Sequence, residues 1–191
     1  MIFAFTALLG CTSSPSPSQS DSGGVEDTAA AWLEELVSDP STVTLVEAGA
    51  WVEVGTESDP FSDRPESVEC SALGYGDENG YFEVDTEACG YGTFRQPLLH
   101  DVGEGEELLI VYWFLELWSA DEGAEGHVAI ALEDGELLVD SQVAIPGDPE
   151  TRKVWLDAPR ALAAGEWIYF HVHNHGYNNW SLGTIQAETV Q

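Results

Sequence analysis

Three of the five histidines in this 191-residue chain lie in one short run, Phe170-His171-Val172-His173-Asn174-His175. Side chains of an extended strand alternate between its two faces, so His171 and His173 point the same way. The apolar alternation of residues 126–132 places His127 on the outer face of a second strand. Two histidines at i and i+2, joined by a third from another strand, supply the nitrogen donors that zinc and copper prefer. The pattern therefore predicts a Zn or Cu site formed by His127, His171 and His173.

Other interpretations of these residues stay open. The histidines can instead form a hydrogen-bonded, partly buried layer with Asn174 and Tyr169. The further side chains that could join a metal site are Glu116, Glu125, His100 and Asp101. A structural calcium ion is the other cofactor considered, because Asp77-Glu78-Asn79-Gly80 and Asp121-Glu122 are clusters of oxygen ligands, although neither has the spacing of a calcium hand.

Aromatic and amide side chains gather around the histidine-rich run. Aromatic rings stack on the apolar faces of pyranoses, while amides and carboxylates hydrogen-bond the hydroxyl groups. A carbohydrate site is therefore predicted from six residues, Trp167, Tyr169, Tyr177, Asn178, Asn179 and Trp180. The alternative is that the tryptophans belong to the hydrophobic core.

The sequence names no catalytic residue. It contains no Gly-x-Ser-x-Gly elbow, Walker loop, His-Glu-x-x-His or Rossmann fingerprint. Its many carboxylates do not single out a glycosidase pair. A binding protein is therefore favoured over an enzyme, with a metal-dependent hydrolase that uses the histidine cluster as the enzymatic alternative.

The charge of the chain limits the classes of molecule that it can bind. The chain has 35 Asp and Glu against 5 Lys and Arg, a formal net charge of −30. Such a surface repels nucleic acid phosphates and anionic headgroups, which excludes nucleic acid as a partner. It favours cations, basic partners or neutral ligands such as a polysaccharide or glycan.

The amino-terminal residues 1–9 form an apolar run that leads into Leu8-Leu9-Gly10-Cys11. Nine residues are too few to span a bilayer as a helix, and they fit the apolar core of a signal peptide. The run resembles the bacterial lipobox, in which a small residue precedes a cysteine that is lipidated on its thiol. The resemblance implies a signal peptide over residues 1–10, lipidation of Cys11 and the lipid bilayer as a partner. Unlike the usual signal peptide, no Lys or Arg precedes the apolar run.

Residues 12–27 are rich in Ser, Pro and Gly and nearly devoid of large apolar side chains. Such a segment cannot bury enough surface to offset the entropy of ordering, so residues 11–28 are predicted to be the lipidated cysteine and a disordered tether. In enteric bacteria an Asp after the lipidated Cys retains the protein in the inner membrane, and Thr12 stands at that position here. The lipobox resemblance thus implies a cell-envelope protein anchored in the outer membrane, facing the periplasm or the surface.

Once Cys11 is assigned to lipid, Cys70 and Cys89 remain of the three cysteines. Exported proteins meet an oxidising compartment, so these two are predicted to form a disulfide. A zinc site is disfavoured because the spacing lacks a Cys-x-x-Cys element.

The rest of the chain, residues 29–191, is predicted to be one all-β domain. A short helix over Ala29–Val37 is followed by short strand-like runs with turn signals between them, which indicates a β-sandwich or jelly roll. Residues 108–118 are the most apolar run, which predicts a central buried strand. Residues 55–80 are predicted to be a long polar loop.

Residues 80–187 resemble galactose-binding-like jelly rolls. The residues that carry the resemblance are Gly80-Tyr81-Phe82-Glu83, Gln96-Pro97-Leu98, Gly103-Glu104-Gly105-Glu106 and the closing run 178–185. The resemblance implies a carbohydrate-binding module, many of which hold a structural calcium. Gly183 stands where that family usually has an Asp, so no ligand residue is carried over. The sequence thus predicts an envelope lipoprotein that binds carbohydrate, with metal binding, or a structural or adhesive role without a small ligand, as alternatives.

Overall fold

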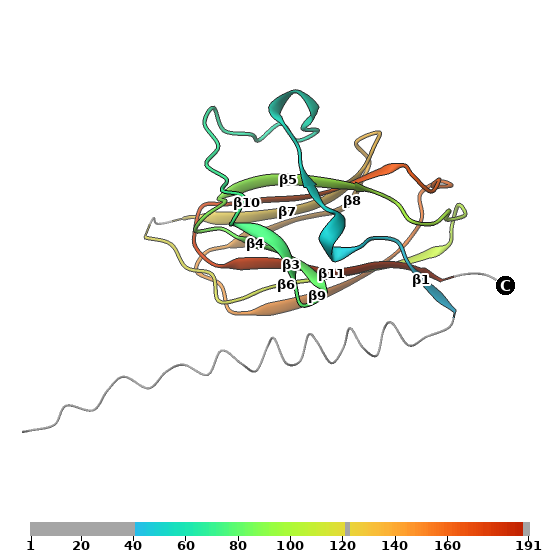
Figure 1. Cartoon of the computed structure of the whole chain (residues 1–191). Helices are drawn as coiled ribbons and strands as arrows, with labels where there is room; N and C mark the ends of the chain where they lie inside the picture. Colours follow the sequence, from blue (N-terminus) through green and yellow to red (C-terminus); the bar gives the residue numbers. More distant parts are fainter. Residues whose placement is uncertain (1–40, 121–122, 189–191) are drawn as a thin grey trace, which may run out of the picture.

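The structure, a computed structural model, describes residues 41–120 and 123–188, and within them eleven strands form two antiparallel sheets. One sheet has the order β3 (Tyr75–Glu78), β4 (Tyr81–Asp85), β11 (Asn179–Glu188), β6 (Glu107–Phe114), β9 (Glu150–Asp157), with β1 (Thr42–Thr44) also paired to β11. The other has the order β2 (Val52–Glu53), β5 (Tyr91–Pro97), β10 (Trp167–Asn174), β7 (Glu125–Leu132), β8 (Leu137–Ala144). We call them sheet A and sheet B. They form the two layers of a sandwich (Figure 1).

The core lies between the two layers and follows from the apolar alternation of their strands. Ile110 and Phe114 of β6 face Ile130 of β7 and Phe170 of β10 across the core, and all four are at most 1% exposed. The strand β6 is apolar on both faces, and seven of its eight residues are buried. It lies between β11 and β9, as predicted for the most apolar run.

The all-β sandwich predicted from the sequence is confirmed. The strand boundaries differ in two places. The apolar run predicted to continue to Trp118 ends as β6 at Phe114, and the predicted polar loop 55–80 contains the strand β3. The Asp77–Gly80 cluster considered for calcium spans the end of β3 and the turn to β4, where Gly80 N donates to Asp77 Oδ1 at 2.8 Å. The signal peptide, Cys11, the tether, the helix Ala29–Val37 and the Asp121-Glu122 cluster lie outside the described residues.

The predicted disulfide is confirmed. Cys70 and Cys89 are bonded, 19 residues apart in sequence. Cys89 is fully buried and precedes β5, so the bond ties the segment between β2 and β3 to sheet B. In the part of the chain that the structure describes, no helix combines the length and apolar character needed to cross a membrane.

Candidate functional site

The three predicted histidines lie together on the outer face of sheet B. The strand β10 runs between β5 and β7, and its register pairs His173 directly with His127 and pairs His171 with Ala129. The intervening Val172 points into the core and is fully buried. The period-two alternation of a strand therefore places the three imidazoles on one side of the sheet.

A segment between β2 and β3 crosses this outer face. We call residues 55–64 the strap; it includes the 3-10 turn η2 (Thr56–Ser58). Asp59, whose side chain is 1% exposed, fixes the strap to β5. Its carboxylate accepts hydrogen bonds from Tyr91 Oη at 2.8 Å and Thr93 Oγ1 at 3.0 Å, and it pairs with Arg64 at 2.8 Å. Figure 1 shows the chain between β2 and β3 rising beyond the layer of sheet B.

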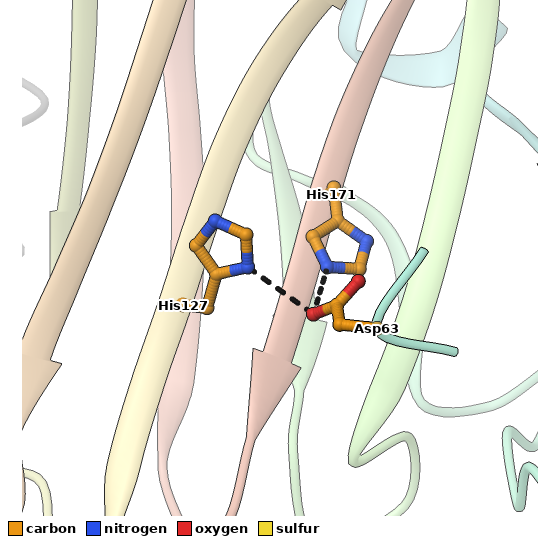
Figure 2. A group of neighbouring side chains, drawn as sticks. All are labelled: Asp63, His127 and His171. Carbon is orange, nitrogen blue, oxygen red and sulfur yellow. Dashed lines mark hydrogen bonds and ion pairs between the residues drawn. The ribbon is translucent and has the colours of Figure 1, made fainter. Parts of the chain in front are cut away.

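The strap places the Asp63 carboxylate next to the three histidines. Asp63 Oδ2 lies 3.0 Å from His173 Nδ1, 3.2 Å from His127 Nδ1 and 3.4 Å from His171 Nε2. Figure 2 shows the rings of His127 and His171 turned toward this one carboxylate, which reaches them from the strap. Three imidazole nitrogens thus converge on a single oxygen. Sequence reasoning missed Asp63, because a polar loop has no periodicity that says where its side chains will lie.

In two of these imidazoles, the ring nitrogen that faces away from Asp63 also has a hydrogen-bond partner. His127 Nε2 lies 2.8 Å from Asp140 Oδ1 on β8, and His171 Nδ1 lies 2.9 Å from Thr93 Oγ1 on β5. The Phe61 ring of the strap stacks on His171, with ring centroids 4.2 Å apart and planes 20° apart. The two imidazoles are therefore fixed in orientation from both sides.

Burial and charge set the protonation of the cluster. Burial lowers the pKa of His171, and this effect outweighs the opposing attraction of Asp63. The surrounding imidazoles, His171 foremost, hold the pKa of the Asp63 carboxyl well below its usual range, against the opposing effect of partial burial. Asp63 is therefore an anion at neutral pH.

A pocket of about 460 Å³ opens beside the cluster, within the volume range of small-molecule sites. Both Asp63 and His127 line it. Its other lining residues come from the strap, from β7, β8 and the turn between them, and from the end of β10: Pro60, Phe61, Ser62, Glu125, Ala131, Gly135, Leu137, Asp140, Gln142, His173 and His175. The pocket is open to solvent, and its lining mixes polar and apolar side chains.

The six residues predicted to bind carbohydrate do not lie in one place. Trp180 is fully buried in the core, and Tyr169 is buried beside Val54 and Ala131. Trp167 is half-buried under the guanidinium of Arg95, 4.3 Å from its ring.

The two predicted amides are engaged with the protein itself. Asn178 donates a hydrogen bond to the carbonyl of Glu116, and Asn179 donates to Glu83 Oε1 at 2.7 Å. Only Tyr177 of the six is exposed, at 42%.

Tyr177 has an exposed partner that sequence reasoning missed. The Trp118 side chain is 54% exposed, and the two ring centroids lie 4.7 Å apart with planes tilted by 31°. Their backbones are bridged, since Tyr177 N donates to Trp118 O at 2.8 Å. We call Trp118 and Tyr177 the aromatic pair. Trp118 was predicted as the end of a buried strand, but the chain leaves the sheet after Phe114.

The additional metal ligands considered from the sequence lie apart from the cluster, except Glu125, which lines the pocket. Asp101 Oδ1 accepts a hydrogen bond from Ala164 N at 2.8 Å, and the side chains of His100 and Glu116 are exposed.

No protein-family model matches this sequence, and no curated protein does. Among solved structures, the N-terminal cellulose-binding domain of Cellulomonas fimi β-1,4-glucanase C is similar, with 13% identity over 74% of this chain and 90% of that one and a TM-score of 0.44. A carbohydrate-binding module described for specific mannan recognition is similar with 12% identity over 78% of this chain and 99% of that one and a TM-score of 0.41. An arabinose-bound α-L-arabinofuranosidase matches with 12% identity over 76% of this chain and a TM-score of 0.40, and this chain spans only 24% of its length.

Proposed function

We propose that this chain is a lipid-anchored protein of the cell envelope whose β-sandwich binds neutral saccharides at the aromatic pair. The observation that carries the saccharide proposal is the solvent exposure of two adjacent aromatic rings, 54% for Trp118 and 42% for Tyr177, on a backbone fixed by a β-bridge. Rings held in place present a stacking surface with little entropy left to lose on binding.

The surroundings of the pair suit an uncharged, hydroxyl-rich ligand. The side chains of Glu116 and His175 are exposed and precede the two aromatic residues by two positions each. They provide hydrogen-bonding groups for sugar hydroxyls beside an apolar stacking surface. The net charge of −30 disfavours acidic or sulfated polysaccharides.

The aromatic pair is tested by affinity electrophoresis and calorimetry with neutral xylan, mannan and β-glucan. Trp118→Ala and Tyr177→Ala are each expected to weaken binding by about tenfold or more, because each removes a stacking ring. Trp155→Ala is the matched control, since Trp155 is 52% exposed but lies on β9 of sheet A. Failure of every polysaccharide to bind the wild type, or an equal loss in Trp155→Ala, contradicts the proposal and leaves the structural or adhesive role.

The anchor is tested by metabolic labelling with a palmitate analogue in a bacterial host. The lipobox resemblance at Leu8–Cys11 leads us to expect label on the wild-type protein and none on Cys11→Ser. Cys70→Ser removes a cysteine of the disulfide instead and is expected to keep the label. Label that survives Cys11→Ser, or a wild type that takes up none, rules out the anchor without bearing on saccharide binding.

A further inference from the structure

The cluster under the strap brings together donor atoms that suit one cation. Asp63 Oδ2 lies 3.2 Å from His127 Nδ1 and 3.4 Å from His171 Nε2 (Figure 2). Such contacts are hydrogen bonds only if each imidazole nitrogen carries a proton. The partners of the opposite ring nitrogens decide where the protons are.

One ring nitrogen of His171 donates its proton to a residue of β5. Thr93 Oγ1 donates its single proton to the carboxylate of Asp59 at 3.0 Å, so toward His171 it can only accept. His171 Nδ1, 2.9 Å away, must therefore carry the ring proton. Nε2, which faces the Asp63 carboxylate, is then the nitrogen at which a metal ion takes the place of a proton.

One ring nitrogen of His127 likewise donates its proton, in this case to a carboxylate on β8. Its Nε2 lies 2.8 Å from Asp140 Oδ1, and an ionised carboxylate only accepts. His127 Nδ1, which faces Asp63 Oδ2, is then the second nitrogen at which a metal ion takes the place of a proton. Two imidazole nitrogens and a carboxylate oxygen thus converge, and together they form a donor set for a single cation.

We propose that Asp63, His127 and His171 bind one divalent transition-metal ion, through Asp63 Oδ2, His127 Nδ1 and His171 Nε2. The three residues each offer a ligand atom within 4.8 Å of the other two. The Asp63 contacts of 3.2 and 3.4 Å match the separation of about 3.3 Å between ligand atoms in a tetrahedral site with bonds near 2.0 Å. Two nitrogen donors favour zinc or copper over calcium or magnesium.

The groups around the cluster suit a metal site. Metal-bound histidines commonly donate their second ring N–H to a carboxylate or another acceptor, as His127 does to Asp140 and His171 to Thr93. His173 is a positioning residue, because its Nδ1 lies 3.0 Å from Asp63 Oδ2 and can orient the carboxylate by donating to it. Asp63 and His127 line the pocket, through which an ion reaches them from solvent.

The metal site is tested by isothermal titration of the chelator-treated protein with Zn²⁺ at pH 7.5. One tight site is expected, and Asp63→Asn and His127→Gln are each expected to weaken it by about 100-fold or more, since each removes a ligand. Asp140→Asn is expected to weaken it by about 10- to 100-fold. His175→Ala is the matched control: it removes a neighbouring exposed pocket histidine that makes no contact with Asp63 among those described, and it is expected to bind zinc like the wild type.

Electron paramagnetic resonance of the Cu²⁺-loaded protein counts the nitrogen ligands and separates the roles. Two coupled nitrogens are expected in the wild type and in His173→Gln, and one in His127→Gln. Because His171 is fully buried, this spectrum replaces a His171 variant that could fail to fold. Zinc binding that Asp63→Asn leaves unchanged would reflect the many surface carboxylates and overturns the proposal. So does nitrogen NMR that shows both rings doubly protonated at pH 7.5 in the presence of zinc.

Discussion

Replacing Trp180 by alanine is expected to lower the free energy of unfolding by about 4 kcal/mol. The indole is fully buried and packs against Phe114, with ring centroids 4.7 Å apart. It also lies directly over Gly126, where an added Cβ would be 2.7 Å from the ring. The substitution removes these contacts and leaves a cavity between the sheets, because strands on both sides prevent collapse. Urea denaturation followed by fluorescence and by circular dichroism measures the loss.

Two variants bracket this prediction. Trp180→Phe keeps most of the buried ring, and Trp180 Nε1 has no hydrogen-bond partner among the described residues, so its cost is expected to be clearly smaller. Trp155→Ala truncates an indole that is 52% exposed and is expected to change stability by about 0.5 kcal/mol or less. A loss below about 1 kcal/mol in Trp180→Ala would show that the core closes around the gap or that the indole packs elsewhere.

The Trp180 result also bears on ligand binding. Trp180 was predicted as a carbohydrate ligand, yet its burial leaves no ring face for a sugar. Loss of saccharide binding in Trp180→Ala is therefore expected to accompany loss of folded protein, whereas Tyr177→Ala is expected to lose binding while its unfolding curve stays close to that of the wild type.

Removing the disulfide with the double substitution Cys70→Ala and Cys89→Ala is expected to lower the free energy of unfolding by about 3 kcal/mol. The bond joins residues 19 apart and so restricts a sizeable loop of the unfolded chain. That loop contains the hairpin of β3 and β4, which contributes the buried Phe82 and Val84 to the core. Denaturation with and without a reducing agent measures the effect.

Reduction supplies the control for the disulfide. A reducing agent is expected to lower the stability of the wild type toward that of the double variant and to leave the double variant unchanged. Equal stability of the oxidised wild type and the double variant would mean that the bond restricts the unfolded chain no more than residual structure already does.

Much of the fold was predictable because the alternation of apolar and polar residues along a strand shows which side chains face the core. The alternation of residues 126–132 and 167–173 identified which side chains point into the core, and the structure follows it at Ile130 and Phe170. The same alternation placed His127, His171 and His173 on one outer face, where the structure has them. The disulfide followed from counting cysteines once Cys11 had been set aside.

The errors have local causes too. Trp180 and Leu182 alternate with Ser181 in the same way as the core residues of the other strands. Trp180 was nevertheless predicted to bind sugar, because amide side chains stand next to it in the sequence. Trp118 continued an apolar run in the sequence, but β6 ends at Phe114, and only the fold shows that Trp118 is exposed beside Tyr177.

The sequence by itself determined which face of each strand carries the histidines, because that follows from the two-residue period of a strand. Only the tertiary structure decided what they meet. Asp63 is 108 positions from His171 and lies in a polar loop, and it reaches the imidazoles because Asp59 fixes the strap to β5. Contacts between a loop and a sheet depend on strand order and on side-chain anchors across the fold, and no periodicity along the chain encodes them.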